Sequence, residues 1–531
     1  MAATPVWSVD PRTGKRHGQV TAEASPRDVD VAVRAAHGAR AALADAPARA
    51  AFLRAAAGLL DGAGERIVET ADAETALGPV RLTGELARTT GQLRAFADLV
   101  EEGSHLDVRI DRADPALTPP RPELRRYKVP LGVVAVYAAS NFPLAFSVPG
   151  GDTASALAAG CPVVVKAHPD HPATSELCAS LLSRAAETAG LPAAVVRVVH
   201  GFDAGLELIR HPLVTAAGFT GSVRGGRALF DAATARPVPI PFHGELGSLN
   251  PVVVTPAAAA ERAVEIGGGL AGSVTLGAGQ FCVKPGLVLV PEGPDGDRLA
   301  DALAASLAQA GPGVLLDRRM REDFLAGVAE RSALPAVTAP VAPGPAGEHA
   351  VGPGYLSVPA AGLLGGGHEL LLAECFGPVT VLVRYAGRRE AAGVLGLLEG
   401  NLTATLQLSA AEAAGTAPAD ATTADAPAGP DGPDVPDAAD APSAAELIGL
   451  VTALAGRVVV NGWPTGVAVA PAQHHGGPYP AATSHSTSVG ATAVERWLRP
   501  VAYQSVPDAL LPPELREANP LGVPRRVTGD R

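Results

Sequence analysis

Residues 133–141 read Val133-Val134-Ala135-Val136-Tyr137-Ala138-Ala139-Ser140-Asn141, and this stretch decides the fold. An apolar run followed by small and polar residues is typical of a buried strand that ends at a ligand site. Similar runs recur downstream, and stretches of helical character separate them. The further predicted strands are 163–165, 195–199, 216–219 and 252–254, and the predicted helices are 147–159, 175–189, 204–210 and 222–233. Repeated strand and helix units predict an α/β fold with a doubly wound parallel sheet, whose ligands bind at the carboxyl ends of its strands.

Polar residues stand where the first four of these strands end. They are Ser140-Asn141, Lys166, His200-Gly201 and Thr220-Gly221-Ser222. A lysine that closes a buried strand is commonly just solvated, but Lys166 lies at the sheet edge where a cofactor ribose or phosphate is expected. The turn from Gly221 to Gly226 is neither a P-loop nor a GxGxxG fingerprint, and an isolated glycine-rich turn is more often structural. Because it precedes a predicted helix, whose N-terminus favours anions, we interpret it as a candidate pyrophosphate site.

The composition limits the classes of protein to which the chain can belong. At 531 residues it exceeds what one hydrophobic core usually serves, so two or three domains are expected. The net charge of −12 argues against a nucleic-acid surface, and no uninterrupted apolar run reaches the roughly 18 residues of a membrane span. Four cysteines without a CxxC pair or a Cys/His spacing suggest neither a disulfide framework nor zinc. We therefore expect a reduced, cytoplasmic protein without a bound metal.

Three regions stand apart from the strand and helix repeats. Ser25-Pro26-Arg27-Asp28 predicts a capped helix that runs to about residue 44, and further Ala-rich helices follow to residue 101. Residues 108–128 alternate apolar and charged side chains around several prolines, which predicts an exposed hairpin. Residues 411–442 lack Lys, Arg and aromatic residues, and six aspartates with Glu412 give them a charge of −7. We expect this segment to be a disordered insertion, because it cannot bury enough apolar surface to offset its ordering entropy.

Cys282 is the candidate nucleophile of a second α/β unit that starts near residue 251. It lies in Gly277-Ala278-Gly279-Gln280-Phe281-Cys282-Val283-Lys284-Pro285-Gly286. A catalytic cysteine needs a partly exposed site with donors that favour the thiolate, and flanking glycines let backbone N–H groups approach closely. A free cysteine is nevertheless more often a small buried hydrophobe. Glu245 and Glu374 also leave two interpretations open, a solvent-facing carboxylate or a group packed against a ligand.

Six short motifs, in this order, resemble those of the aldehyde dehydrogenase superfamily and cover most of the chain. They are Ser140-Asn141-Phe142-Pro143, Lys166, Phe219-Thr220-Gly221-Ser222 with Gly226, Glu245-Leu246-Gly247, Gln280-Phe281-Cys282 and Glu374-Cys375-Phe376-Gly377-Pro378. The chain is more closely similar to the α-ketoglutaric semialdehyde (2,5-dioxovalerate) dehydrogenase branch. That similarity rests on Lys166-Ala167-His168-Pro169, on His475-Gly476-Gly477-Pro478-Tyr479-Pro480 ahead of Thr487-Ser488-Val489-Gly490, and on Leu498-Arg499-Pro500-Val501-Ala502-Tyr503-Gln504. The resemblance implies two doubly wound, Rossmann-like domains and a β-hairpin oligomerisation arm.

The resemblance also implies a reaction, the NAD(P)-dependent oxidation of an aldehyde to a carboxylic acid. The substrate of the similar branch is 2,5-dioxovalerate and the product is 2-oxoglutarate. Cys282 would attack the aldehyde carbon, and the Asn141 side-chain amide and the Cys282 backbone N–H would hold the oxyanion. Hydride transfer would leave a thioester on the cysteine, and Glu245 would activate the water that hydrolyses it.

The implied cofactor site draws on residues from both units. Lys166 and Glu374 would hold the adenosine-side and nicotinamide-side ribose hydroxyls, and Ser222 would contact the pyrophosphate. The other implied cofactor-binding residues are Ser140, His168, Thr220, Gly221, Gly226, Leu246 and Phe376. Many NAD-preferring relatives carry a glutamate three residues after the lysine, where this chain has Pro169. Without that carboxylate a 2′-phosphate meets no clash, which favours NADP over NAD, whereas Asp203 offers an acid in place of the arginine of a strict NADP enzyme.

The same resemblance implies the domain limits and the partners. Residues 1–107 and 129–245 would form the NAD(P)-binding domain, and residues 246–472 the catalytic domain that carries the nucleophile. Residues 108–128 and 497–531 would form the oligomerisation arm and the C-terminal tail of a homodimer or homotetramer. The remaining partner would be a small-molecule aldehyde, with neither a nucleic acid nor a membrane involved.

Two alternative functions are weighed against this one. A dehydrogenase for fatty or other aliphatic aldehydes would need an apolar tunnel, whereas an acidic aldehyde needs a cation in the pocket. The sequence alone places neither an arginine nor His474 or His475 there. A non-catalytic relative that serves as a binding protein would be expected to have lost Cys282, Glu245 or Asn141, and all three are present.

Overall fold

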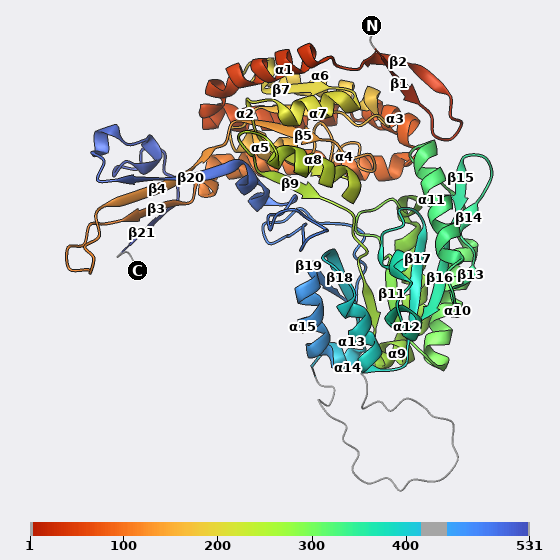
Figure 1. Cartoon of the computed structure of the whole chain (residues 1–531). Coiled ribbons are helices and arrows are strands. Elements are labelled where there is room, and N and C mark those ends of the chain that lie inside the picture. Colours follow the sequence, from red (N-terminus) through yellow and green to blue (C-terminus); the bar gives the residue numbers. More distant parts are fainter. Residues whose placement is uncertain (1–3, 416–442, 529–531) are drawn as a thin grey trace.

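The computed structural model describes residues 4–415 and 443–528. This part of the chain forms an N-terminal body and a C-terminal body, stacked one above the other, and a smaller sheet that projects to one side (Figure 1). Each body contains its own mainly parallel sheet. Within the described ranges, no helix is both long and apolar enough to cross a bilayer.

The N-terminal body contains a parallel five-stranded sheet in the order β7-β6-β5-β8-β9. Its strands are β5 (Val133–Tyr137), β6 (Val163–Lys166), β7 (Val196–Val199), β8 (Val214–Thr220) and β9 (Phe242–Glu245). The first four confirm the predicted strands, whereas β9 was not predicted. Val134 and Val136 of β5 pack into one hydrophobic core, and Val133 and Ala135 pack into another. The sheet is therefore buried on both faces, as the unbroken apolar runs predicted.

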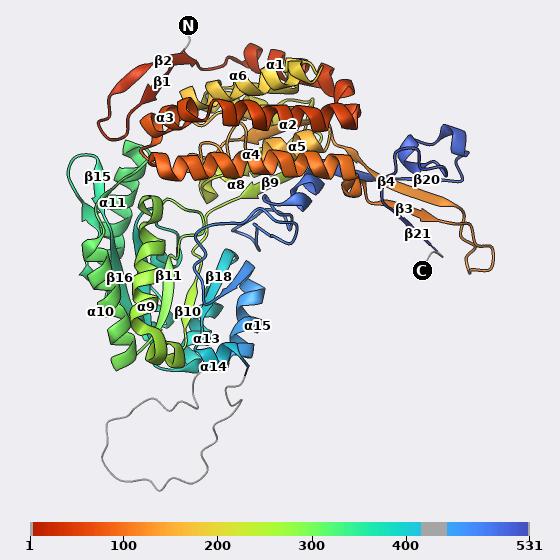
Figure 2. The same ribbon diagram turned by 180° about the vertical axis from the view of Figure 1, so that it is seen from behind.

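Helices cover both faces of this sheet. They are α1 (Pro26–Ala39), α2 (Ala46–Gly62), α3 (Gly64–Thr75), α4 (Pro79–Glu102), α5 (Gly151–Ala158), α6 (Pro172–Thr188), α7 (Phe202–Arg210) and α8 (Val223–Thr234). The predicted start of α1 is confirmed, because Ser25 and Asp28 form a reciprocal capping box. The α-helix ends earlier than expected, at Ala39, and a 3₁₀ turn continues it to Ala44. Figure 2 shows α2 and α4 side by side across the back of this body.

The C-terminal body contains a seven-stranded sheet in the order β13-β16-β17-β11-β10-β18-β19. Its strands are β10 (Val252–Val254), β11 (Leu287–Pro291), β13 (Thr338–Val341), β16 (Gly354–Pro359), β17 (Val379–Tyr385), β18 (Asn401–Gln407) and β19 (Ala455–Val460). The edge strand β13 runs antiparallel to β16, and the other neighbours are parallel. The helices of this body are α9 (Pro256–Thr275), α10 (Pro294–Gln309), α11 (Arg318–Ser332), α12 (Ala360–Leu364), α13 (Arg388–Gly396), α14 (Ala410–Ala413) and α15 (Ala444–Leu454). A small sheet of β12 (Gly313–Val314), β15 (Ala350–Gly352) and β14 (Gly344–Pro345) lies beside it.

The projecting sheet is larger than the hairpin that the sequence predicted. Strands β3 (Val108–Asp111) and β4 (Leu124–Pro130) form the hairpin, and β20 (Leu498–Gln504) and β21 (Arg525–Val527) from the C-terminal tail add a strand at each edge. The hairpin alone would be only marginally stable in water, and the two further strands stabilise it. A second hairpin, β1 (Pro5–Val9) and β2 (Arg16–Ala22), lies at the N-terminus (Figure 1).

The predicted disordered segment 411–442 begins too early. Its first residues belong to α14, which Ser409 and Glu412 close with a capping box. Glu412 also accepts a hydrogen bond from Thr255, at 2.7 Å, so its charge has a folded partner. The rest of the segment, 416–442, lies outside the described residues.

Candidate active site

The candidate site lies where the two large sheets meet end to end. In the N-terminal body, Asn141 follows β5 and Lys166 ends β6, as predicted, and Glu245 ends β9, a strand that was not predicted. In the C-terminal body they precede the strands, because Cys282 lies ahead of β11 and Glu374 lies ahead of β17. The junction is therefore formed by the carboxyl ends of one sheet and the amino ends of the other.

The loop that carries Cys282 owes its shape to backbone conformations that glycine favours. Gly277, Ala278 and Gly279 have φ values of +57°, +55° and +69° between the end of α9 and the cysteine. A Cβ on Gly279 would lie 2.3 Å from the backbone carbonyl of Gly377. The predicted close approach of backbone at these glycines is thus present, and it packs the Cys282 loop directly against the loop of Glu374.

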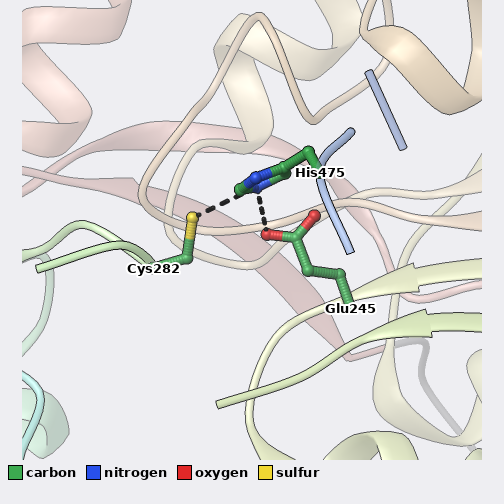
Figure 3. A group of neighbouring side chains, drawn as sticks. All are labelled: Glu245, Cys282 and His475. Carbon is green, nitrogen blue, oxygen red and sulfur yellow. Dashed lines mark hydrogen bonds and ion pairs between the residues drawn. The ribbon is translucent and has the colours of Figure 1, made fainter. Parts of the chain in front are cut away.

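Cys282, His475 and Glu245 form one hydrogen-bonded group (Figure 3). The Nε2 atom of His475 lies 2.9 Å from Oε1 of Glu245 and 3.6 Å from Sγ of Cys282. Ser488 donates a second hydrogen bond to Oε2 of Glu245 at 2.8 Å. Cys282 is partly exposed, whereas Glu245 and His475 are buried. The tertiary fold therefore joins three residues that lie far apart in the sequence.

The ionisation state of Glu245 determines which atoms of this group carry hydrogen. Burial by itself favours the protonated acid, but His475 and the hydrogen bonds from His475 and Ser488 outweigh it and hold the pKa of Glu245 below its ordinary value. An ionised carboxylate only accepts hydrogen bonds, so Nε2 of His475 must carry the hydrogen. His475 is thus a donor to Glu245, and Glu245 is the base of the group.

The electrostatics of Cys282 correct one expectation from the sequence. Its surroundings were expected to favour the thiolate, but burial and the nearby Glu245 carboxylate raise the pKa of the thiol well above its ordinary value. Desolvation disfavours the charged form, and a neighbouring anion disfavours it further. The resting side chain is therefore a neutral thiol with a base beside it.

The same three residues have the chemistry of a metal-binding group. Their ligand atoms all lie within 4.8 Å of one another. In a tetrahedral zinc site with metal–ligand bonds of about 2.0–2.1 Å, two ligand atoms lie about 3.3 Å from each other. The 2.9 Å between Glu245 and His475 is instead a hydrogen-bond distance. The observed geometry is that of a proton-sharing group.

Asn141 is held close to the loop of the cysteine. Its Nδ2 donates to the carbonyl of Gln280 at 2.9 Å, two residues before Cys282. The backbone carbonyl of Asn141 accepts a hydrogen bond from Arg81. An amide nitrogen carries two hydrogens, so Nδ2 keeps one donor beyond the bond to Gln280.

Lys166 is buried at the sheet edge rather than solvated. Burial lowers the pKa of its ammonium group to about 8, and Nζ lies 4.8 Å from the centre of the Phe202 ring. Within residues 4–415 and 443–528, no hydrogen bond or ion pair to Nζ is found. Ser140 is partly exposed at the end of the neighbouring strand, and His168 pairs with Asp170 at 3.3 Å. A buried ammonium group without a partner fits the phosphate or ribose of a nucleotide.

The N-terminus of α8 faces the same edge of the sheet. Thr220 ends β8, Gly221 and Ser222 are exposed, and the Ser222 hydroxyl accepts a hydrogen bond from Gly225 N at 3.2 Å. A Cβ on Gly226 would lie 2.1 Å from a methyl carbon of Leu246, so this glycine lets the helix pack against the strand end. The exposed helix N-terminus can receive a nucleotide phosphate, while the serine side chain serves as its cap.

Glu374 and Phe376 lie on the loop ahead of β17, and both are partly exposed. Burial raises the pKa of Glu374 to about 7, although Lys284 opposes the shift. Lys284 donates from Nζ to the carbonyls of Cys375 and Val379, at 3.1 and 2.6 Å, and so fixes this loop to the loop of Cys282. The loop of Glu374 is thus held beside the loop of Cys282.

A cavity of about 250 Å³ opens at Cys282. It is lined by Arg81, Gly84, Glu85, Arg88, Phe142, Phe146, Phe281, Cys282, Val283, Gly466, Val467 and His475. The sequence singled out His475 as part of a motif but gave it no role, and it did not single out Arg81 or Arg88. The two arginines lie seven residues apart, two turns along one face of α4, but nothing in the sequence indicated that this face lines the site.

The fold and the site together place the chain in the class of α/β dehydrogenases. A model of the aldehyde dehydrogenase family matches residues 2–334, which is more than half of the chain. The chain therefore belongs to the aldehyde dehydrogenase family, and it is an oxidoreductase that uses a nicotinamide nucleotide. Alpha-ketoglutaric semialdehyde dehydrogenase 2 of Azospirillum brasilense is 46% identical over 488 residues, which cover 91% of this chain and 87% of that protein. Alpha-ketoglutaric semialdehyde dehydrogenase of Acinetobacter baylyi is 38% identical, covering 99% of this chain and 96% of that protein.

Solved structures share the fold at low sequence identity. Aldehyde dehydrogenase 21 of Physcomitrella patens, in complex with succinate, has a TM-score of 0.75 at 19% identity, and the match covers 94% of each chain. Glyceraldehyde-3-phosphate dehydrogenase of Methanocaldococcus jannaschii, in complex with NADP, has a TM-score of 0.76 at 17% identity, covering 95% of this chain and 99% of that chain. These similarities show the aldehyde dehydrogenase fold of the chain.

Proposed function

We propose that this chain oxidises 2,5-dioxovalerate to 2-oxoglutarate through a covalent thioester on Cys282. The observation that carries the mechanism is the hydrogen-bonded group of Cys282, His475 and Glu245 at the cavity, with the base 2.9 Å from its donor. The substrate follows from the two relatives named for this aldehyde, which match 91% and 99% of the chain.

The proposed reaction begins with a proton transfer. Glu245 takes the thiol proton, and Sγ of Cys282 bonds to the aldehyde carbon to give a thiohemiacetal. The free hydrogen of the Asn141 amide and the Cys282 backbone N–H bind the oxyanion, and such donors are typically worth about 3 kcal/mol each. When bound, the nicotinamide supplies the acceptor for the hydride that leaves the carbon, so a thioester remains.

Hydrolysis of the thioester then returns the enzyme to its starting state. Glu245 first releases the thiol proton to solvent. It then removes a proton from water, the water oxygen bonds to the acyl carbon, the carbon–sulfur bond breaks, and the proton on Glu245 passes to the departing thiolate. By donating to Glu245, His475 favours its ionised form before each of these proton transfers. The products are 2-oxoglutarate and the reduced nucleotide.

We assign the cofactor contacts to the residues at the sheet edge. The Lys166 ammonium group would bind the adenosine ribose, with Ser140 and His168 beside it, and the N-terminus of α8 at Thr220, Gly221 and Ser222 would bind the pyrophosphate. Gly226 and Leu246 shape that turn, and Glu374 and Phe376 would face the nicotinamide ribose. Pro169 is exposed and offers no carboxylate of its own, which supports NADP as the preferred nucleotide, although Asp170 and Glu23 act on the nearby Lys166.

We also propose that the projecting sheet joins subunits into a homodimer or homotetramer. A sheet that stands away from the body with two open edges is a ready surface for pairing with another chain. The four free cysteines support a reducing, cytoplasmic location.

A steady-state panel tests the substrate and the cofactor together. We expect 2,5-dioxovalerate to give the highest kcat/KM when compared with succinic semialdehyde, glutaraldehyde and a long-chain aldehyde, and NADP to exceed NAD. A preference for the long-chain aldehyde would overturn the substrate assignment and leave the reaction type intact. A preference for NAD would overturn the cofactor assignment.

A further inference from the structure

One face of helix α4 forms a wall of the cavity at Cys282. Arg81, Glu85 and Arg88 follow one another at helical spacing, and all three line the cavity. Guanidinium groups keep their charge at any physiological pH. The cavity wall therefore carries two fixed cations in surroundings that are otherwise largely aromatic.

Arg81 is already committed to the protein. Its Cζ lies 4.9 Å from the centre of the Phe142 ring and 4.6 Å from that of Phe281, so the guanidinium group contacts two phenyl rings, which meet each other edge to face. It also donates to the backbone carbonyl of Asn141. These contacts fix Phe142 and Asn141 beside the cysteine, which makes Arg81 a positioning residue.

Arg88 has no comparable commitment. Its Cζ lies 5.2 Å from the centre of the Phe146 ring. Its Nε is buried without a hydrogen-bond partner, as are Nε and Nη1 of Arg81, so the two arginines differ in the hydrogen bond that Arg81 makes to Asn141. In the part of the chain that the structure describes, no hydrogen bond or ion pair of Arg88 is found. A buried cation without a partner is costly, so its site is suited to an anionic ligand.

Glu85 makes its hydrogen bonds to backbone groups rather than to the two arginines. Its Oε1 accepts hydrogen bonds from the backbone N–H groups of Leu144 and Ala145, at 2.8 and 2.9 Å. Burial raises the pKa of its carboxyl group. Among residues 4–415 and 443–528, it forms no ion pair with Arg81 or Arg88. The carboxylates of Glu85 and Glu245 both act on Arg88, but among the described residues neither forms a hydrogen bond or ion pair with it, so the guanidinium group of Arg88 has no direct partner.

We propose that Arg88 binds the carboxylate at the far end of the substrate and so makes the enzyme specific for aldehydes that carry an acid group. This inference rests on the proposed function, because it takes Cys282 as the group that holds the aldehyde end. The guanidinium fork matches a carboxylate with two parallel N–H donors, which a lysine cannot reproduce. The phenyl rings around it pack against the carbon chain and exclude water from the ion pair.

A pair of substrates that differ only in charge tests the role of Arg88. They are 5-oxopentanoate, which carries the terminal carboxylate, and pentanal, which lacks it. We expect Arg88→Gln to lower kcat/KM for 5-oxopentanoate by about 100-fold, mainly through KM, as expected when a desolvated ion pair loses one partner. The value for pentanal should change by less than about threefold, because no carboxylate is lost. Arg88→Lys should restore part of the loss.

Two further variants control the experiment. Arg94→Gln makes the same change on the same helix, at a side chain that is 46% exposed and paired with Asp61, and should leave both substrates unchanged. Arg81→Gln should impair both substrates together, because Arg81 positions the catalytic residues. If Arg81→Gln rather than Arg88→Gln loses 5-oxopentanoate selectively, Arg88 is not the carboxylate-binding residue.

The outcomes separate this inference from the proposed function. A wild-type enzyme that prefers pentanal contradicts the proposed function and with it the role of Arg88. A wild-type enzyme that prefers 5-oxopentanoate, together with an Arg88→Gln variant that keeps this preference or loses both substrates equally, contradicts the role of Arg88 alone.

Discussion

Glu245 and Cys282 are neighbours whose pKa values are shifted in opposite directions. The pKa of the glutamate lies below its ordinary value, and that of the cysteine lies well above. Ionising both members of a buried pair of acids costs a large free energy. The negative charge therefore resides on the acid whose ionised form accepts more hydrogen bonds. Here that group is Glu245, which His475 and Ser488 hold. The thiol therefore stays neutral until a substrate arrives, which protects it from adventitious oxidation.

Replacing Cys282 tests the nucleophile itself. We expect Cys282→Ala to lower NAD(P)H formation by more than about 1,000-fold, because neither covalent intermediate can form. Nucleotide binding, followed by fluorescence titration, should persist because Lys166 and the N-terminus of α8 are untouched. A variant that retains its turnover would show that the nucleophile is misassigned.

Removing His475 should change the pH profile of the enzyme. His475 opposes the effect of burial on Glu245, so in His475→Ala burial prevails and the pKa of Glu245 rises. Glu245 acts as a base only when ionised, and the wild-type enzyme therefore keeps its active form to acidic pH. In the variant, the acid limb of kcat/KM against pH should move to higher pH by at least about one unit.

Ser488→Ala provides the matched comparison, because it removes only the other hydrogen bond to Glu245. Its acid limb should move in the same direction by less. An acid limb that stays in place in His475→Ala would mean that His475 does not control the ionisation of Glu245.

The loop between α9 and β11 is the element that presents the nucleophile. The sequence indicated a glycine-rich turn, but which glycine is indispensable depends on what faces it. Gly279 meets the backbone of Gly377, which cannot move aside like a flexible side chain. The nearby Gly272 of α9 has no heavy atom within 4 Å of the position of a Cβ.

These two glycines should respond to alanine in opposite ways. Gly279→Ala should destabilise the fold by at least about 1–3 kcal/mol, through the left-handed backbone and the clash. It should also lower kcat/KM by about 100-fold, since a displacement of about 1 Å at the reacting atom has that effect. Gly272→Ala should stabilise the helix by about 0.5–1 kcal/mol and leave turnover unchanged. Thermal unfolding and initial rates measure both, and equal effects at the two positions would contradict this explanation.

At the scale of the whole molecule, the two large sheets carry the residues of the candidate site, and the projecting sheet stands apart from them. Most of the proposed nucleotide contacts lie on the N-terminal body, whereas Cys282, Glu374 and Phe376 lie on the C-terminal body, so the proposed reaction depends on how the bodies are held together. The bond from Asn141 to Gln280 and the group of Glu245, His475 and Cys282 cross that junction. The projecting sheet takes no part in the site, which supports a role in assembly.

The assembly proposal gives a direct expectation in solution. The chain should sediment as a multiple of its 53.3 kDa mass. Leu510, which follows β20 in the tail and is 75% exposed, is a candidate contact, and Leu510→Asp should shift the distribution to smaller species. Val31→Asp, at a 54% exposed valine on α1 of the N-terminal body, should leave it unchanged. A wild-type chain that stays monomeric at micromolar concentration would contradict the proposal.

The sequence by itself determined four of the five strands of the N-terminal sheet, because short apolar runs such as Val133–Tyr137 are buried on both faces and need no long-range information. It also indicated Cys282, Glu245 and Asn141, because each of them lies in a short motif that neighbouring residues in the sequence make recognisable. Only the tertiary structure decided that His475 lies between Glu245 and Cys282, that β20 and β21 complete the projecting sheet, and that the face of α4 with Arg88 lines the cavity. These features depend on contacts between residues hundreds of positions apart, which no local pattern encodes. The pKa of the cysteine likewise follows from burial and from a distant carboxylate, so the flanking glycines could not indicate its direction.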